Sequence, residues 1–225
     1  MMNVWAIVPV KPLSRAKSRL TDELMPDQRE QLATSLLMRT VRMLLPLSQI
    51  QGVLVISRDT KALAMVRELG AQTVQESGAP ELNNALLRAT QALRAWGADA
   101  ALVVPADIPL LVPEDVEGVV NLGRYHNSVV IAPDRHEQGT NLLLVRPPGV
   151  IPYAFGSGSF DEHRRLARAA NVSVAVYRSE HVALDIDTPA DLQRYYELAK
   201  ALGEPIIEHT TSGEWVLTGE QLLKP

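Results

Sequence analysis

Short runs of apolar residues alternate with longer segments in which apolar residues recur at helical spacing, almost to the end of the chain. The short runs have the length of buried strands. They predict strands over residues 4–8, 53–57, 73–75, 100–104, 128–132, 141–145 and 172–177. The periodic segments predict helices over residues 27–45, 60–69, 84–96, 113–122, 160–170 and 189–202. This alternation favours an α/β fold with a mostly parallel sheet that is covered by helices on both faces.

The chain changes in character after its last predicted helix. A capping-box pattern begins that helix at Thr188, and Gly203 ends it. We therefore expect one domain over residues 1–203 and a tail over residues 204–225. The tail is expected to pack on the same domain or at a homodimer interface, and residues 214–218 predict a lone strand within it.

Composition limits the classes of function. The chain has 225 residues, of which 46% are hydrophobic, which is enough for a full core. It has no cysteine, which excludes disulfides and thiolate metal sites. A net charge of −4 argues against a general nucleic-acid role. No apolar stretch is long enough to span a bilayer and no signal peptide is evident, so we expect a cytoplasmic protein without a membrane partner.

A cluster of cations follows the first predicted strand. Lys11, Arg15, Lys17 and Arg19 lie within nine positions, just past residues 4–8. Open α/β sheets bind ligands at the carboxyl ends of their strands. Lysine binds phosphate as a point charge, whereas arginine forks onto two oxygens. The loop therefore predicts a polyanion site, most simply for a triphosphate, with a solvated basic turn as the alternative.

Three aspartates predict a site for a hard divalent cation. Asp107 follows residues 100–104 and so lies at the carboxyl end of a central strand. Asp185 and Asp187 are two residues apart on a segment that we expect to be extended, which directs both side chains to one face. Carboxylate oxygens suit Mg²⁺, which binds few carboxylates together with substrate phosphates. The alternatives are a turn aspartate at Asp107 and a helix-start residue at Asp187.

Two further segments offer groups to an anion. Thr140 opens a strand and supplies a hydroxyl and a backbone amide. Residues 155–160 place Gly156 and Ser159 at the start of a helix, where free amides can hold a phosphate or carboxylate, although ordinary loops share this composition. Asn83 is an adequate helix cap, and the second interpretation is an amide that contacts a base or ribose. The histidines show no metal-ligand spacing.

Taken together, these residues resemble those of one family. The motifs that carry the resemblance are Val8-Pro9-Val10-Lys11, Arg15-Ala16-Lys17-Ser18-Arg19-Leu20, Leu82-Asn83, Pro105-Ala106-Asp107-Ile108-Pro109, Ala132-Pro133-Asp134, Gly139-Thr140-Asn141, Gly156 to Phe160 with His163, and Asp185-Ile186-Asp187-Thr188-Pro189. Over residues 4–202 the chain is similar to the guanylyltransferases of coenzyme F-420 biosynthesis. That family activates 2-phospho-L-lactate, phosphoenolpyruvate or, rarely, 3-phosphoglycerate with GTP.

The resemblance implies a single Rossmann-like nucleotidyltransferase domain of the GT-A type over residues 1–203. The implied reaction transfers GMP from GTP to the phosphate of a three-carbon phospho-acid and releases pyrophosphate. By similarity, the Mg²⁺ ligands are Asp107, Asp185 and Asp187, and the contacts to the acceptor are Thr140, Gly156 and Ser159. The GTP side is made by Lys11, Arg15, Lys17, Arg19, Leu82 and Asn83, and the catalytic groups are Lys17, Arg19 and Asp107.

The implied mechanism needs no protein nucleophile, because the acceptor phosphate is already an anion. Catalysis then consists of positioning and charge neutralisation. Two alternatives stay open. One is a nucleotidyltransferase that uses another nucleoside triphosphate or a sugar phosphate, and the other is a non-catalytic regulator that binds a nucleotide.

Overall fold

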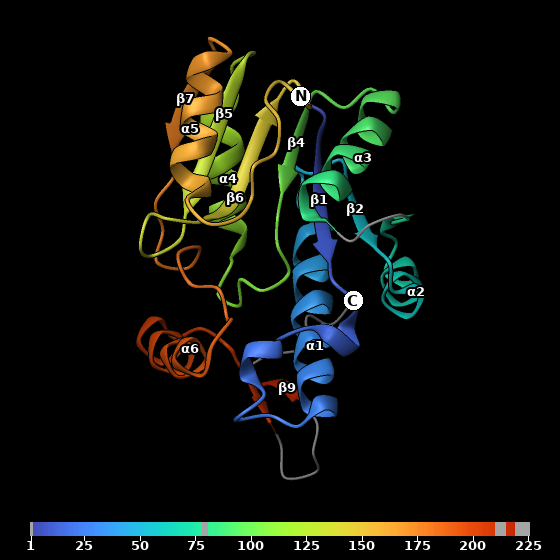
Figure 1. Cartoon of the computed structure of the whole chain (residues 1–225), viewed down its shortest axis with the longest axis vertical. Helices are drawn as coiled ribbons and strands as arrows, with labels where there is room; N and C mark the ends of the chain where they lie inside the picture. Colours follow the sequence, from blue (N-terminus) through green and yellow to red (C-terminus); the bar gives the residue numbers. More distant parts are fainter. Residues whose placement is uncertain (1, 78–80, 210–214, 219–225) are drawn as a thin grey trace.

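The computed structural model describes residues 2–77, 81–209 and 215–218. Its main sheet has seven strands in the order β3-β2-β1-β4-β6-β5-β7 (Figure 1). In chain order the strands are β1 (Val4–Val10), β2 (Gly52–Ser57), β3 (Gln72–Gln75), β4 (Ala100–Val103), β5 (Ser128–Pro133), β6 (Thr140–Arg146) and β7 (Ser173–Val176). β6 is antiparallel to both of its neighbours, and the other pairs in this sheet are parallel. The predicted mostly parallel sheet is confirmed.

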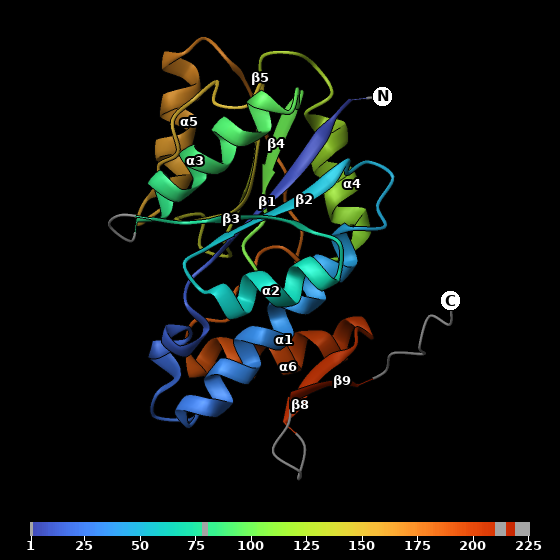
Figure 2. The same cartoon turned by 90° about the vertical axis from the view of Figure 1, so that its right-hand side faces the viewer.

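Helices cover both faces of this sheet. Figure 2 shows α3 and α5 on one side of the strands and α4 on the other. The helices of the first face are α3 (Leu82–Ala95) and α5 (Ser159–Ala169), and those of the second are α1 (Pro26–Leu44), α2 (Thr60–Glu68) and α4 (Pro113–Leu122). None of the helices in the described part of the chain is long and apolar enough to cross a bilayer.

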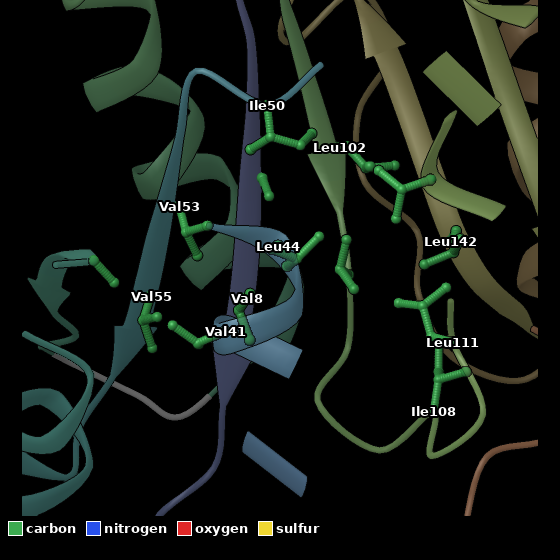
Figure 3. Packing of buried hydrophobic residues seen from close by; sticks show 14 of the residues in the cluster. Val8, Val41, Leu44, Ile50, Val53, Val55, Leu102, Ile108, Leu111 and Leu142 are labelled. Carbon is green, nitrogen blue, oxygen red and sulfur yellow. The ribbon is translucent and has the colours of Figure 1, made fainter. Parts of the chain in front are cut away.

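The alternation of side chains along each strand produces two cores. On β1, Val4, Ala6 and Val8 belong to the core under α1, α2 and α4, whereas Ile7 belongs to the core under α3 and α5. Figure 3 shows part of the first core, where Val41 of α1 lies beside Val8. Full burial of such an aliphatic side chain stabilises the fold by about 1.5–3 kcal/mol. The two cores therefore hold the sheet rigidly and fix the loops at the ends of its strands.

A third core joins the last elements of the chain to α1. These elements are α6 (Pro189–Leu202) and a small antiparallel sheet of β8 (Ile206–His209) and β9 (Trp215–Thr218). Ile207 and Trp215 are buried in one cluster with residues of α1 and α6. The described part of the predicted tail thus contacts the main domain, while residues 210–214 and 219–225 lie outside the described residues. The domain boundary in front of the tail stays a prediction.

Each predicted strand and helix over residues 4–202 has a counterpart whose ends differ by at most two residues, with two corrections of detail. The predicted lone strand is not alone, because β9 pairs with β8. The helix α3 begins at Leu82 with Glu81 at its cap position, so the helix-cap interpretation of Asn83 is wrong and this residue lies in the first turn.

Candidate functional site

A cleft of about 590 Å³ opens at the carboxyl ends of β1, β2 and β4. Its walls come from the loop after β1, the loop after β4, the start of β6 and the segment that leads into α5. This is the place where open α/β sheets bind ligands. The residues expected at the site that line the cleft are Lys11, Arg15, Lys17, Leu82, Asp107, Thr140, Gly156, Ser159, Asp185 and Asp187.

The loop that carries the cations is anchored at both of its short 3-10 turns. These turns are Leu13–Arg15 and Ser18–Leu20, and they bury Leu13 and Leu20 in the protein interior. The backbone amide of Leu13 also donates to the carboxylate of Asp59 at 2.8 Å. The same carboxylate accepts two amides in the first turn of α2. Apolar burial and one shared carboxylate therefore fix the loop against the body of the protein.

Lys17 is the central cation of this loop. Its backbone is left-handed, with a φ of 54°, which is uncommon for a residue with a Cβ. Its side chain is only 6% exposed, and the ammonium lies 3.1 Å from Asp107 Oδ2 and 3.7 Å from Asp187 Oδ1. It also donates to the carbonyl of Ile186 at 2.6 Å. Arg19, at the exposed rim, reaches Asp187 Oδ2 at 3.3 Å. The cationic loop and the acidic segments thus form one charge-paired wall.

Asp185 is the third carboxyl of this wall. Burial, and next the negative charges of Asp107 and Asp187, raise the pKa of Asp185 to about 6. The amide of Ile186 donates to the carbonyl of Asp107 at 3.0 Å, which ties the two acidic segments together. The carboxylate of Asp191 accepts the amide of Asp187 at 3.2 Å and so fixes the other end of the segment. The three carboxyls therefore form one region of negative charge, which Lys17 partly neutralises.

The chemistry of these donors fits Mg²⁺. Asp107, Asp185 and Asp187 provide hard oxygen ligands. Within residues 2–77, 81–209 and 215–218, no group of three or more His, Cys, Asp or Glu side chains is arranged to hold a metal ion by itself, and Lys17 lies between two of the acids. Mg²⁺ typically uses one or two carboxylates and completes its shell with water and phosphate. The three residues therefore fit an ion that arrives with a nucleotide.

A second wall of the cleft, around Thr140 and His163, is hydrogen-bonded and consists of neutral side chains apart from Asp134. Thr140 Oγ1 lies 3.0 Å from His163 Nδ1, and the backbone amide of Ala154 donates to His163 Nε2 at 3.1 Å. The imidazole is fully buried and packs edge-on against Phe155, with ring centroids 5.0 Å apart. Burial lowers the pKa of His163 to about 4, against the smaller opposing effect of the Glu162 charge. The ring is therefore neutral at pH 7.

Asn83 fixes the segment that leads into α5. Its Nδ2 donates to the carbonyl of Phe155 at 3.1 Å, and the amide of Phe155 donates to its Oδ1 at 2.8 Å. Gly156 follows with a φ of 143°, a conformation that favours glycine. Ser159 then begins α5, and its amide donates to the carbonyl of Gly156 at 3.1 Å. The side chain expected to contact a base or ribose thus holds protein backbone.

A tight loop before β6 positions Thr140. The carboxylate of Asp134 accepts the backbone amides of Gln138 and Gly139, at 3.0 and 2.8 Å. A Cβ on Gly139 would lie 2.7 Å from Asp134 Oδ2, so any side chain at this position would require the Asp134 carboxylate to move. Thr140 then enters β6 with its side chain buried against His163.

The charged residues of the site are visible in the sequence, whereas several residues that position them are not. A helix cap at Asp59 is visible in the sequence, but its bond to Leu13 is a tertiary contact without a local signal. His163 lies four residues after Ser159, and this helical spacing places the two on one face. That spacing is the signal that could have assigned His163 to the acceptor wall.

One family model and two relatives that this chain matches are named as guanylyl transferases. A family model described as guanylyl transferase CofC like matches residues 4–197. The phosphoenolpyruvate guanylyltransferase of Rubrobacter xylanophilus is 42% identical over 193 residues, which cover 86% of this chain and 93% of that protein. The 2-phospho-L-lactate guanylyltransferase of Methanothermobacter thermautotrophicus is 37% identical over 191 residues, which cover 85% of this chain and 83% of that protein.

A solved structure supports the fold. The crystal structure of a putative nucleotide-diphospho-sugar transferase from Desulfovibrio desulfuricans G20 aligns with a TM-score of 0.72 over 89% of both chains. Its sequence is 19% identical, so this likeness concerns the fold alone. It confirms the predicted Rossmann-like α/β fold.

Proposed function

The chain belongs to the family of CofC-like guanylyl transferases, and from this premise we propose that it transfers the GMP moiety of GTP to the phosphate of a three-carbon phospho-acid. The acceptor is phosphoenolpyruvate or 2-phospho-L-lactate, the acids for which its relatives are named. We place the reaction in coenzyme F-420 biosynthesis and, because GTP is the donor, in the cytoplasm.

One observation carries this proposal. A single cleft brings together a cationic loop, three aspartates and a neutral wall of hydrogen-bonding groups. Transfer between two phosphates needs all three, because two anions must meet in the correct geometry. A site that only binds a nucleotide has no need of the second wall around Thr140 and Ser159.

The reaction is a direct displacement at phosphorus. An oxygen of the acceptor phosphate attacks the α-phosphorus of GTP, a new P–O bond forms, and the bond from the α-phosphorus to the oxygen bridging to the β-phosphate breaks. Pyrophosphate leaves with the electron pair of that bond. No protein nucleophile takes part, since the acceptor is already an anion at pH 7. The residues of the cleft therefore act by holding the two substrates in line.

Each wall has its own task in this mechanism. Lys11 and Arg15 bind the phosphates of GTP, whereas Lys17 and Arg19 offset the charge that builds on the leaving pyrophosphate. Thr140 and the segment from Gly156 to Ser159 orient the acceptor phosphate. Leu82 lines the nucleotide side of the cleft.

The proposal includes a dependence on Mg²⁺. Asp107, Asp185 and Asp187 would hold the ion, and their donor chemistry supports this assignment. When bound, Mg²⁺ neutralises phosphate charge and lowers the repulsion between the two substrates. Without it, the aspartates themselves would repel the triphosphate.

Pyrophosphate release tests the function directly. The purified protein is incubated with Mg²⁺, GTP and one acid in each of three parallel reactions. The acids are phosphoenolpyruvate, 2-phospho-L-lactate and 3-phosphoglycerate. We expect release with one of the first two acids, and none with GTP alone or in excess EDTA. Comparison of the three acids identifies the acceptor: phosphoenolpyruvate and 2-phospho-L-lactate differ in one double bond, whereas 3-phosphoglycerate carries its phosphate on C3 and a free hydroxyl on C2.

Other outcomes would contradict the proposal in different ways. If pyrophosphate is released with CTP or a sugar phosphate but with none of the three acids, the proposed donor or acceptor is wrong. The displacement mechanism would still hold. Tight binding of GTP with no release under any condition would indicate a regulator that binds a nucleotide.

A further inference from the structure

His163 is a buried imidazole to which the mechanism above gives no task. It lies on α5, and both of its ring nitrogens have partners. One partner is the backbone amide of Ala154, which precedes Gly156 by two residues. The other is the hydroxyl of Thr140, a residue that lines the cleft. The ring therefore connects two parts of the acceptor wall without facing the cleft.

The amide of Ala154 determines which nitrogen of the ring carries the proton. A backbone N–H only donates, so Nε2 accepts its hydrogen bond and has no proton. In a neutral imidazole the single proton then lies on Nδ1, which donates to Thr140 Oγ1 across 3.0 Å. Burial lowers the pKa of His163 to about 4, which agrees with a neutral ring.

This bond leaves the hydroxyl proton of Thr140 for another partner. A hydroxyl has one proton and two lone pairs, and the histidine uses a lone pair. Because His163 donates to this hydroxyl, the ring cannot accept the hydroxyl proton, which stays available for a donated hydrogen bond. A phosphate oxygen that approaches from the cleft offers the lone pair that this proton needs.

We propose that His163 is a positioning residue that commits the Thr140 hydroxyl to donate a hydrogen bond to the phosphate of the acceptor acid. This inference rests on the proposed function and adds to it the residue that sets the polarity of the acceptor wall. His163 does not touch the acceptor, and its effect passes entirely through Thr140. Its loss therefore weakens binding of the acceptor and leaves binding of GTP unchanged.

A matched pair of substitutions separates the two nitrogens of the ring. His163→Asn places an amide near the Nδ1 position, where it can still donate to Thr140. His163→Gln reaches the Nε2 position, where it can accept from Ala154 but cannot replace the donor to Thr140. We expect the asparagine variant to keep the KM for the acceptor within about threefold of wild type and the glutamine variant to raise it about tenfold or more.

These constants are measured by pyrophosphate release at saturating GTP, and the KM for GTP is measured at a saturating acceptor. Thermal unfolding of each variant confirms that it is folded. An equal rise of both KM values would indicate a merely structural role and overturn the inference. A raised acceptor KM in the asparagine variant would also overturn the inference. The asparagine variant therefore tests the inference even if the glutamine variant fails to fold.

A double-mutant cycle with Thr140→Val tests the route through the hydroxyl. Valine keeps the shape of the side chain and removes the donor, so we expect the acceptor KM to rise about 10- to 100-fold. Adding His163→Gln should then raise it no further, because both changes remove the same contact. A full additional loss in the double variant would show that His163 acts through Ala154 instead.

Failure of the proposed function would be a separate result. If wild type releases no pyrophosphate with any acid, the reaction is wrong, but the role of His163 can still be measured calorimetrically as the Kd for phosphoenolpyruvate without GTP. His163→Gln should weaken this binding about tenfold and His163→Asn should not. Equal binding by wild type and both variants would overturn the inference about His163 alone.

Discussion

The two walls of the cleft are built on opposite principles. On one wall the Lys17 ammonium lies between Asp107 and Asp187, so the charges are partnered with one another. On the other wall Thr140 and His163 form a neutral, buried hydrogen-bonded pair. The first wall balances formal charges, whereas the second fixes the direction of individual donors.

This difference indicates which wall rearranges when substrates arrive. Lys17 cannot remain fully paired with Asp107 and Asp187 and also neutralise a phosphate, so we expect a bound nucleotide to change its partners. The donors of the neutral wall already have their directions set. Groups that are preorganised in this way bind without reorganisation at the moment of reaction. The charged wall is therefore the adaptable one and the neutral wall the rigid one.

Substitution on the charged wall should have the largest effect. Asp185→Asn keeps the size of the side chain and removes the negative charge that an Mg²⁺ ligand needs. We expect kcat for pyrophosphate release to fall by about 10² to 10⁴, which corresponds to several kcal/mol of transition-state stabilisation.

The matched control is Asp161→Asn on the exposed surface of α5. Asp161 pairs with Arg164 at 2.9 Å and has a side chain that is 80% exposed. This variant should keep the kcat of wild type. If Asp185→Asn retained wild-type kcat at saturating Mg²⁺, the assignment of Asp185 as a metal ligand would be wrong.

The two walls should also respond to pH in opposite directions, which is the next largest effect. The pKa of His163 is about 4 in the folded protein, below its ordinary 6.5, so between these values only the unfolded chain binds the proton. Its contribution to the free energy of unfolding is full above pH 6.5 and is lost as the pH falls towards 4. This loss amounts to up to about 3 kcal/mol.

The contribution of Asp185 to the free energy of unfolding changes with pH in the opposite direction. Its pKa is raised from 3.8 to about 6, so between these values the folded protein holds the proton that the unfolded chain releases. Its contribution is full below pH 3.8 and is lost as the pH rises through 6, by at most about 3 kcal/mol, less because of its partial exposure.

Denaturant unfolding measures both contributions, in a chelating buffer between pH 4 and pH 7. The difference between wild type and His163→Gln should rise with pH, and the difference between wild type and Asp185→Asn should fall with pH. Two differences that change in the same direction, or not at all, would contradict the contrast between the walls.

The charged wall was also the more predictable one from the sequence. Lysine, arginine and aspartate near the ends of predicted strands carry their chemistry in the residue type, so the sequence alone singles out Lys17, Asp107 and Asp185. Their pairing was not, because the contact between Lys17 and Asp187 joins residues 170 positions apart whose distance depends on the whole sheet. The strands and helices themselves were predictable because their apolar periodicity is local.

The neutral wall was harder to predict because its residues are chemically ordinary. Asn83 has the residue type of a helix cap, yet α3 begins one residue before it. Its side-chain amide instead makes two hydrogen bonds with the backbone of Phe155. His163 has no metal-ligand spacing, and its role depends on a hydrogen bond from Ala154. The direction of a hydrogen bond between residues far apart in the chain is a property of tertiary structure and leaves no local pattern in the sequence.

The smallest expected effect comes from the anchors behind the walls, Asp59 and Asn83. Asp59→Ala removes the cap of α2 and the partner of the Leu13 amide, so the free energy of unfolding should fall by about 1 kcal/mol. The cationic loop then loses an anchor, and the KM for GTP should rise while the KM for the acceptor stays constant. Asn83→Ala removes the two hydrogen bonds to Phe155, so the KM for the acceptor should rise while the KM for GTP stays constant. A rise in the KM for GTP in the Asn83 variant would instead support the nucleotide contact that the family resemblance implies. Asn83 on α3 would then contribute to both walls of the cleft.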